Sequence, residues 1–125
     1  MVMTLTNNEI YNYATSLSEE FGKDNISLPI KVNFYLQKNI KELIALAQEI
    51  EEKRIEIAKK YGEVSEDGNQ YQVPEDKIQD ASNELEELFG LTQDVNIYKI
   101  SLDAFGDIEL TASQMKALLF MIEDE

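Results

Sequence analysis

Carboxylate side chains are the first residues of this chain whose chemistry needs an explanation, because Asp and Glu outnumber Lys and Arg by 25 to 11. Carboxylate oxygens bind Ca²⁺ when several of them converge in one loop. Asp103, Asp107 and Glu109 lie close together in an expected turn, but their spacing does not follow a standard calcium loop. Asp67-Gly68-Asn69 likewise lacks the acids of an EF-hand. We therefore expect no metal site.

Other acids gather on helix surfaces that we expect to face solvent: Glu51, Glu52, Glu56, Glu84, Glu86 and Glu87. A catalytic carboxylate would need apolar or like-charged neighbours that shift its pKa, which a solvated face does not supply. The chain has no Cys and no His, so disulfides, thiol nucleophiles, imidazole bases and Cys/His zinc sites are excluded. Gly-rich phosphate loops and nucleophile elbows are absent as well. We expect neither an enzyme nor a bound cofactor.

Two groups of polar residues are candidates for protein contacts. The first group combines an aromatic ring, two amides and a base, a mixture found at interfaces: Tyr35, Gln37, Lys38 and Asn39. The alternative is that this stretch is a helix start whose aromatic rings lie in the core. The second group centres on Arg54, which lies on an apolar helix face. Its stem either covers the core at the helix margin, or its guanidinium pairs with Glu84 or Glu87 across a helix–helix interface.

A long amphipathic helix must position these side chains. Its expected buried stripe, which we call the seam, follows alternating steps of four and three: Leu36, Ile40, Leu43, Ala47, Ile50, Arg54, Ile57 and Tyr61. The helix should begin near Pro29 and end at Gly62. A helix over 75–89 should fold back antiparallel onto it but covers only half of the seam. The remainder needs the terminal helices or a second copy of the chain.

The first and last helices are expected to begin with the same signal. Thr6 with Glu9, and Thr111 with Gln114, have the spacing of a capping box, in which each side chain bonds the other residue's backbone amide. Gly22 is a typical helix stop, so the first helix should end there. The last helix is expected to continue to residue 122.

Between these helices the sequence predicts a small amount of β structure. Residues 63–73 are expected to form a hairpin that turns at Asp67-Gly68. Residues 94–102 are rich in β-branched and aromatic side chains and predict a strand, which we expect to join that hairpin in a small sheet. The predicted fold is a single domain over residues 1–125, of mostly helical α+β class. It contains a long antiparallel helical hairpin, flanking N- and C-terminal helices and a small β element.

The net charge of −14 is distributed unevenly along the chain. Residues 1–60 carry nine acids and eight bases, whereas residues 61–125 carry sixteen acids and three bases. An acidic surface repels nucleic-acid backbones and anionic membranes, so we expect neither as a direct partner. No run of about 18 apolar residues occurs, and the first residues lack the layout of a signal peptide, so we expect a cytoplasmic location.

Several segments resemble small acidic proteins of tailed phages and prophages of Gram-positive bacteria: Gln37-Lys38-Asn39-Ile40-Lys41, Glu49-Ile50-Glu51-Glu52-Lys53-Arg54, Lys60-Tyr61-Gly62-Glu63 with Glu66-Asp67-Gly68-Asn69, and Ile108-Glu109-Leu110-Thr111-x-x-Gln114-Met115. The resemblance implies a viral protein in the host cytoplasm and transfers no activity or functional residue. We expect a non-catalytic interaction or assembly module with a protein partner, self-associating through the long helix into a homo-oligomer. The alternative is an acidic inhibitor that mimics nucleic acid and binds a basic host protein.

Overall fold

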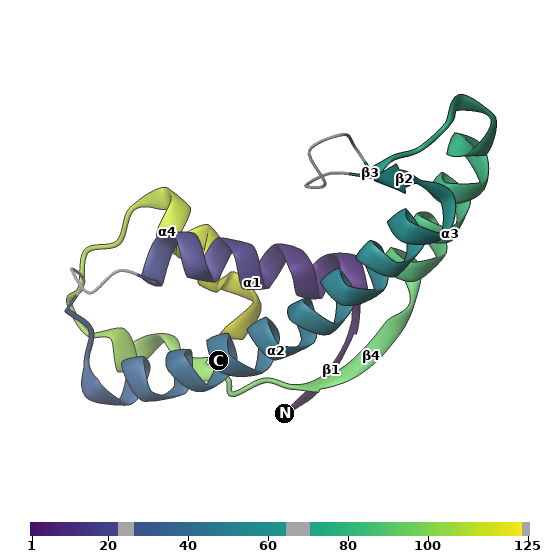
Figure 1. Ribbon diagram of the computed structural model, residues 1–125. Helices are drawn as coiled ribbons and strands as arrows, with labels where there is room; N and C mark the ends of the chain where they lie inside the picture. Colours follow the sequence, from purple (N-terminus) through teal and green to yellow (C-terminus); the bar gives the residue numbers. More distant parts are fainter. Residues whose placement is uncertain (23–26, 65–70, 124–125) are drawn as a thin grey trace.

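The long helix is the central element of the computed structural model, which describes residues 1–22, 27–64 and 71–123. Helix α2 (Ile30–Tyr61) spans 32 residues, as the seam predicts, and ends at Gly62. Helix α1 (Asn7–Phe21) packs along the N-terminal half of α2, and α3 (Ile78–Gly90) lies beside the C-terminal half (Figure 1). The described part of the protein is therefore mostly helical and elongated along α2.

The capping box predicted at the start of α1 is present. The Glu9 amide donates to the Thr6 hydroxyl oxygen at 3.1 Å, and the Thr6 amide donates to the Glu9 carboxylate at 2.9 Å. At the other end of α1, the Gly22 amide donates a hydrogen bond to the Ser18 carbonyl oxygen. A Cβ at residue 22 would clash with that oxygen, so glycine fits this position. Both ends of α1 are therefore set by interactions between residues that are close in the sequence.

The last helix is shorter than predicted. Helix α4 (Ala112–Leu118) begins with the expected capping box between Thr111 and Gln114, but it is followed by a 3₁₀ turn, η3 (Leu119–Met121), and a strand, β6 (Ile122–Glu123). Residue 122 pairs with a strand instead of continuing the helix. The cap was predictable because it is local, whereas the end of the helix is decided by that distant pairing.

The β structure also differs from the prediction. Strand β1 (Val2–Thr6) pairs antiparallel with β4 (Thr92–Asn96), and β5 (Ile100–Ser101) pairs parallel with β6. The strand predicted over 94–102 is thus interrupted at residues 97–99, and its two parts pair with segments near the chain ends. The 63–73 segment forms its own pair, β2 (Glu63–Val64) with β3 (Tyr71–Gln72), and its predicted turn at 67–68 lies outside the described residues.

The core lies between α1, the first half of α2 and the C-terminal segments. Its most deeply buried large side chains come from all three: Ile10, Leu17, Val32, Leu36, Leu43, Ile97, Ile100, Leu118 and Met121. The 3₁₀ turn η2 (Leu102–Phe105) adds Phe105. Elements of the same chain therefore cover the seam from Leu36 to Ile50. Helix α1 and the C-terminal segments of the same chain supply this cover, for which the sequence had allowed either the terminal helices or a second copy.

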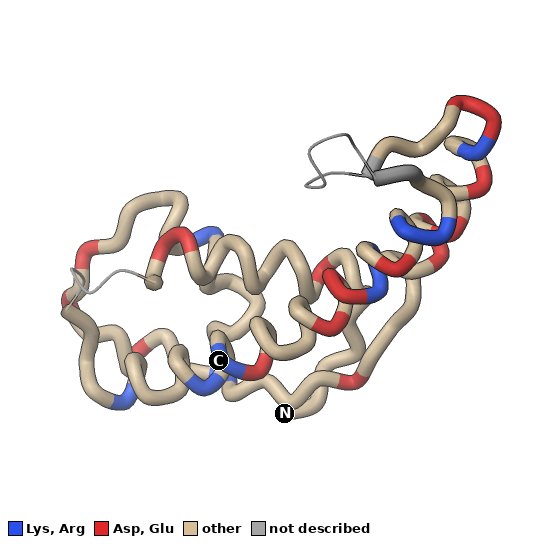
Figure 2. The backbone as a smooth tube through the Cα atoms, in the orientation of Figure 1, with Lys and Arg blue, Asp and Glu red and all other residues tan. Residues whose placement is uncertain are grey.

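Beyond the core, residues 51–61 of α2 form an arm together with β2, β3, the 3₁₀ turn η1 (Glu75–Lys77) and α3. In Figure 2 the α2 part of this arm carries acids and bases interspersed, whereas α3 carries acids alone. The seam is less deeply buried here, since Ile57 is only half-buried and Arg54 is exposed. The arm is therefore the part of the molecule where α2 is least covered.

Candidate protein-binding site

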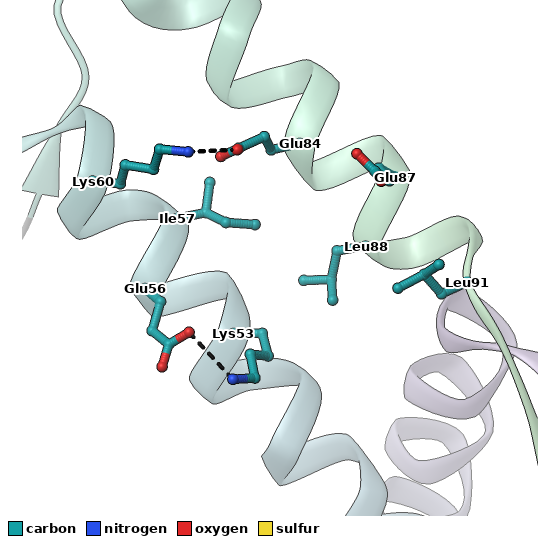
Figure 3. Close-up of a pocket in the computed structure, with 8 residues that line it drawn as sticks. All are labelled: Lys53, Glu56, Ile57, Lys60, Glu84, Glu87, Leu88 and Leu91. Atoms are coloured by element: carbon teal, nitrogen blue, oxygen red, sulfur yellow. Dashed lines mark hydrogen bonds and ion pairs between the residues drawn. The ribbon is translucent and has the colours of Figure 1, made fainter.

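A groove runs between α2 and α3 on the arm, and we call it the arm groove (Figure 3). Its volume is about 450 Å³, and it is lined by residues of both helices and of the segment after α3: Lys53, Glu56, Ile57, Lys60, Glu84, Glu87, Leu88 and Leu91. Ile57, Leu88 and Leu91 form an apolar floor, and charged side chains form the rim. An open groove of this composition suits a side chain or helix of another protein better than a small polar substrate.

Ion pairs hold the rim of the arm groove. The Lys60 ammonium lies 2.7 Å from the Glu84 carboxylate and bridges α2 and α3, whereas Lys53 lies 3.4 Å from Glu56 within α2. The hydrogen bond to Glu84, with a smaller effect of Tyr61, raises the pKa of Lys60 above its ordinary value. Lys60 therefore stays charged through the neutral range.

Arg54 does not make the cross-helix contact predicted for it. Its guanidinium donates to the Glu51 carboxylate three residues earlier on the same helix, with Nε to Oε2 at 2.9 Å. That hydrogen bond lowers the pKa of Glu51 and raises the pKa of Arg54. The cross-helix pairing predicted with Glu84 or Glu87 is therefore wrong. Lys60 pairs with Glu84 instead, and it lies six residues, about one and two-thirds turns, further along α2 than Arg54.

The predicted contact residues Tyr35, Gln37, Lys38 and Asn39 occupy very different surroundings. The Tyr35 ring stacks on Tyr98 with centroids 5.6 Å apart, and the Lys38 ammonium lies 5.2 Å from the same Tyr98 ring. Gln37 is exposed and donates to the Asn33 side chain at 3.4 Å. The structure thus divides the predicted patch, and it leaves Lys38 and Gln37 exposed at the surface.

Asn39 has no exposed surface. Its Nδ2 donates to the Tyr98 carbonyl at 2.9 Å, and its Oδ1 accepts from the Tyr98 amide at 2.8 Å. This pair, which we call the Asn39 clamp, satisfies the backbone of the segment that interrupts the predicted strand. A buried amide that is fully bonded stabilises the fold. Asn39 is therefore a structural residue of the core and not a partner contact.

One exposed feature of α2 was missed because the sequence interpretation followed the buried seam. Opposite the seam, exposed side chains recur at steps of four and three, or at their sum, and we call them the α2 strip: Phe34, Lys38, Lys41, Ala45, Gln48, Glu52 and Lys59. From Ile30 to Lys41 the helix carries three bases and no acid, whereas from Glu42 to Glu56 it carries five acids and two bases. The same heptad counting would have found this strip.

The acids predicted as a weak metal candidate do not gain ligands from elsewhere in the described structure. Over residues 1–22, 27–64 and 71–123, acids and other potential ligands do not gather in groups of three or more that could hold an ion. Asp103 lies within η2 and Asp107 follows it, and both are exposed, as is Glu109. The chemistry that these residues can perform is hydrogen bonding and ion pairing at a surface.

Comparison with protein-family models, with curated proteins and with solved structures gives no match. Within the described residues, no helix combines the length and the apolar character needed to cross a bilayer. The site must therefore be interpreted from its own geometry, which is a charged strip on one side of α2 and an apolar-floored groove on the side of the seam.

Proposed function

We propose that this protein is a non-catalytic interaction module that self-associates through α2. The observation that carries the proposal is the α2 strip, an exposed stripe at heptad spacing with Lys38 and Lys41 before its midpoint and Glu52, followed by Lys59, after it. A surface of that kind is complementary to itself when a second copy runs in the opposite direction. We further interpret α2 and α3 as an antiparallel helical hairpin that holds the strip straight.

Exposed apolar side chains at the start of α2 support the proposal. Ile30 is 89% exposed and Phe34 is 57% exposed, and both lie on the outward side of a helix whose other side is buried from Val32 to Ile50. Large apolar side chains left in water on a charged helix are typical of contact surfaces. Lys53, Glu56 and Lys60 line the arm groove on the same helix, so α2 carries both features, the groove on the side of the seam and the strip on the opposite side.

The test is the mass of the particle in solution as a function of concentration. Sedimentation velocity from about 1 µM to about 1 mM covers the range of association free energies expected for a modest interface. We expect the mass to rise from one chain to two over this range. A single-chain mass at every concentration would refute self-association and with it the proposed function.

An acidic inhibitor is the second candidate, and the composition of α3 and the residues before it favours it. Residues 71–90 carry six acids and one base, which is complementary to a basic groove on another protein. In this case the chain stays a single copy and captures a basic protein from a host lysate, with affinity falling steeply as salt rises. Phage or prophage origin, which belongs to both proposals, is tested by the neighbouring genes.

A further inference from the structure

The α2 strip has the spacing of a second helix-pairing stripe. Its members follow steps of four, three, four, three and four from Phe34 to Glu52, and the half-buried Ile55 continues the pattern to Lys59. Such spacing keeps one stripe of a helix facing a neighbouring helix over several turns. At 1.5 Å per residue α2 is roughly 48 Å long, enough for a two-helix contact of three heptads. The seam occupies the other side of the same helix.

We propose that two copies of this chain pair antiparallel along the α2 strip, with a two-fold axis at the level of Leu46 and Ala47. This proposal rests on the proposed function and specifies its partner and register. Lys41 of one copy then faces Glu52 of the other, and Lys38 packs between Glu52 and Glu56. Because the axis is two-fold, each of these contacts is made twice.

Charge decides the direction of pairing. A parallel arrangement would place Lys38 against Lys38 and Glu52 against Glu52, which is repulsive at both ends of the strip. The antiparallel arrangement replaces both repulsions by attraction. At its centre lie the neutral residues Ala45 and Gln48, and the small Ala45 side chain lets the two helices approach closely. The sequence of the strip is therefore compatible with one direction and not with the other.

The ends of the paired helices bring together the exposed Phe34 of one copy and Lys59 of the other. An ammonium over an aromatic ring is attracted by the ring's negative face, and Phe34 already accepts such a contact from Lys38 at 4.9 Å. The apolar surface of Phe34 is thereby covered by the partner's lysine stems.

Charge reversal on each half of the strip tests this register. Lys38→Glu/Lys41→Glu changes the formal charge from −14 to −18, and Glu52→Lys/Glu56→Lys changes it to −10. We expect sedimentation to give dimer dissociation constants at least about tenfold weaker for each variant alone, because every facing pair becomes repulsive. An equimolar mixture of the two should regain the affinity of the unmodified chain, because all pairs are again attractive.

The mixture isolates local pairing from overall repulsion. Its two chains together carry the same total charge as two unmodified chains, −28. Moreover, Glu52→Lys/Glu56→Lys lowers the magnitude of the net charge of each copy, so this variant should self-associate more tightly if only net charge mattered. If local pairing matters, the same variant should self-associate more weakly. Lys77→Glu/Lys116→Glu and Glu19→Lys/Glu109→Lys are matched controls, since these exposed residues lie off α2 and give the same charge changes.

The outcomes separate the register from the function. If the unmodified chain forms dimers and both α2 variants dimerise equally well, or the mixture fails to recover, the register is wrong while self-association stands. If the unmodified chain is a monomer throughout, the proposed function and the register fail together. Thermal melting of each variant close to that of the unmodified chain confirms that the exposed substitutions leave the fold intact.

Discussion

The Asn39 clamp gives the sharpest prediction about stability. Asn39→Ala removes both hydrogen bonds to Tyr98 and leaves the Tyr98 amide and carbonyl without their partner. The clamp joins α2 to a segment 59 residues later in the chain, so its loss acts on tertiary structure and not on the helix alone. We expect the variant to fold with a clearly lower free energy of unfolding.

The size of the effect follows from the burial of the clamp. A buried backbone group left without a hydrogen bond costs about 1–3 kcal/mol. Tyr98 is half-buried, so water partly compensates, and two such groups should together cost about 2–4 kcal/mol. A typical domain has an unfolding free energy of about 5–15 kcal/mol, so this loss is a large fraction of the total.

Urea unfolding followed by circular dichroism measures the effect, with Asn33→Ala as the matched control. Asn33 lies on the exposed side of the same helix, so both variants share the gain in helix propensity from Asn to Ala. Their difference therefore isolates the clamp. Faster hydrogen exchange at the Tyr98 amide should accompany the loss. A free-energy difference below about 0.5 kcal/mol between the two variants would refute this account of the buried amide.

Three further predictions concern single side chains. Thr6→Ala removes the cap of α1 and should lower the unfolding free energy by about 1 kcal/mol in urea. Arg54→Ala should lower the unfolding free energy by less than about 0.5 kcal/mol, because the Arg54–Glu51 pair is exposed. Since Arg54 lowers the pKa of Glu51 in the folded state, this difference should disappear as the pH falls below about 4. Burial, and to a smaller extent the Glu9 charge, raises the pKa of Tyr13 in the folded state, so the unmodified chain should lose stability as the pH rises above about 10. Tyr13→Phe should lose less stability over the same range, as measured by the melting temperature at each pH.

Features set by neighbouring residues were predictable from the sequence. The bounds of α2 follow from Pro29, the seam and Gly62, and both capping boxes follow from a four-residue pattern. The first half of the seam is buried as expected, because the apolar spacing requires a cover whatever supplies it. The sequence therefore predicted both ends of α1 and α2, the start of α4 and the inward side of the first half of α2.

Features set by distant partners were not predictable. Residues 94–102 have a strand's composition, but whether they pair with residues 2–6 and 122–123 or with 63–73 depends on how the chain closes. Asn39 is polar and was assigned to a contact surface, and its burial depends on the Tyr98 backbone reaching it. Arg54 had several acids within reach, and the nearest one on its own helix prevails because that pairing costs the least side-chain ordering.

Salt separates the two functional proposals because the chain is strongly acidic overall while the α2 strip is complementary to itself. Two copies, each with a net charge of −14, repel each other over long distances. This long-range repulsion is largely screened at about 0.15 M salt, where the Debye length is about 8 Å. The facing Lys–Glu contacts of the strip lie well inside that distance and are screened less. Self-association should therefore strengthen from about 0.01 M to about 0.15 M salt and weaken again near 1 M, as measured by sedimentation.

An acidic inhibitor and the basic groove that it binds carry opposite charges, so added salt has no repulsion between them to screen. Its affinity for the basic protein should fall at every increase in salt over the same range. A steady fall in self-association from the lowest salt would contradict the antiparallel strip, because the long-range repulsion between two acidic chains must be relieved first. The shape of the salt curve, rather than its slope at one point, therefore decides how the acidic surface is used.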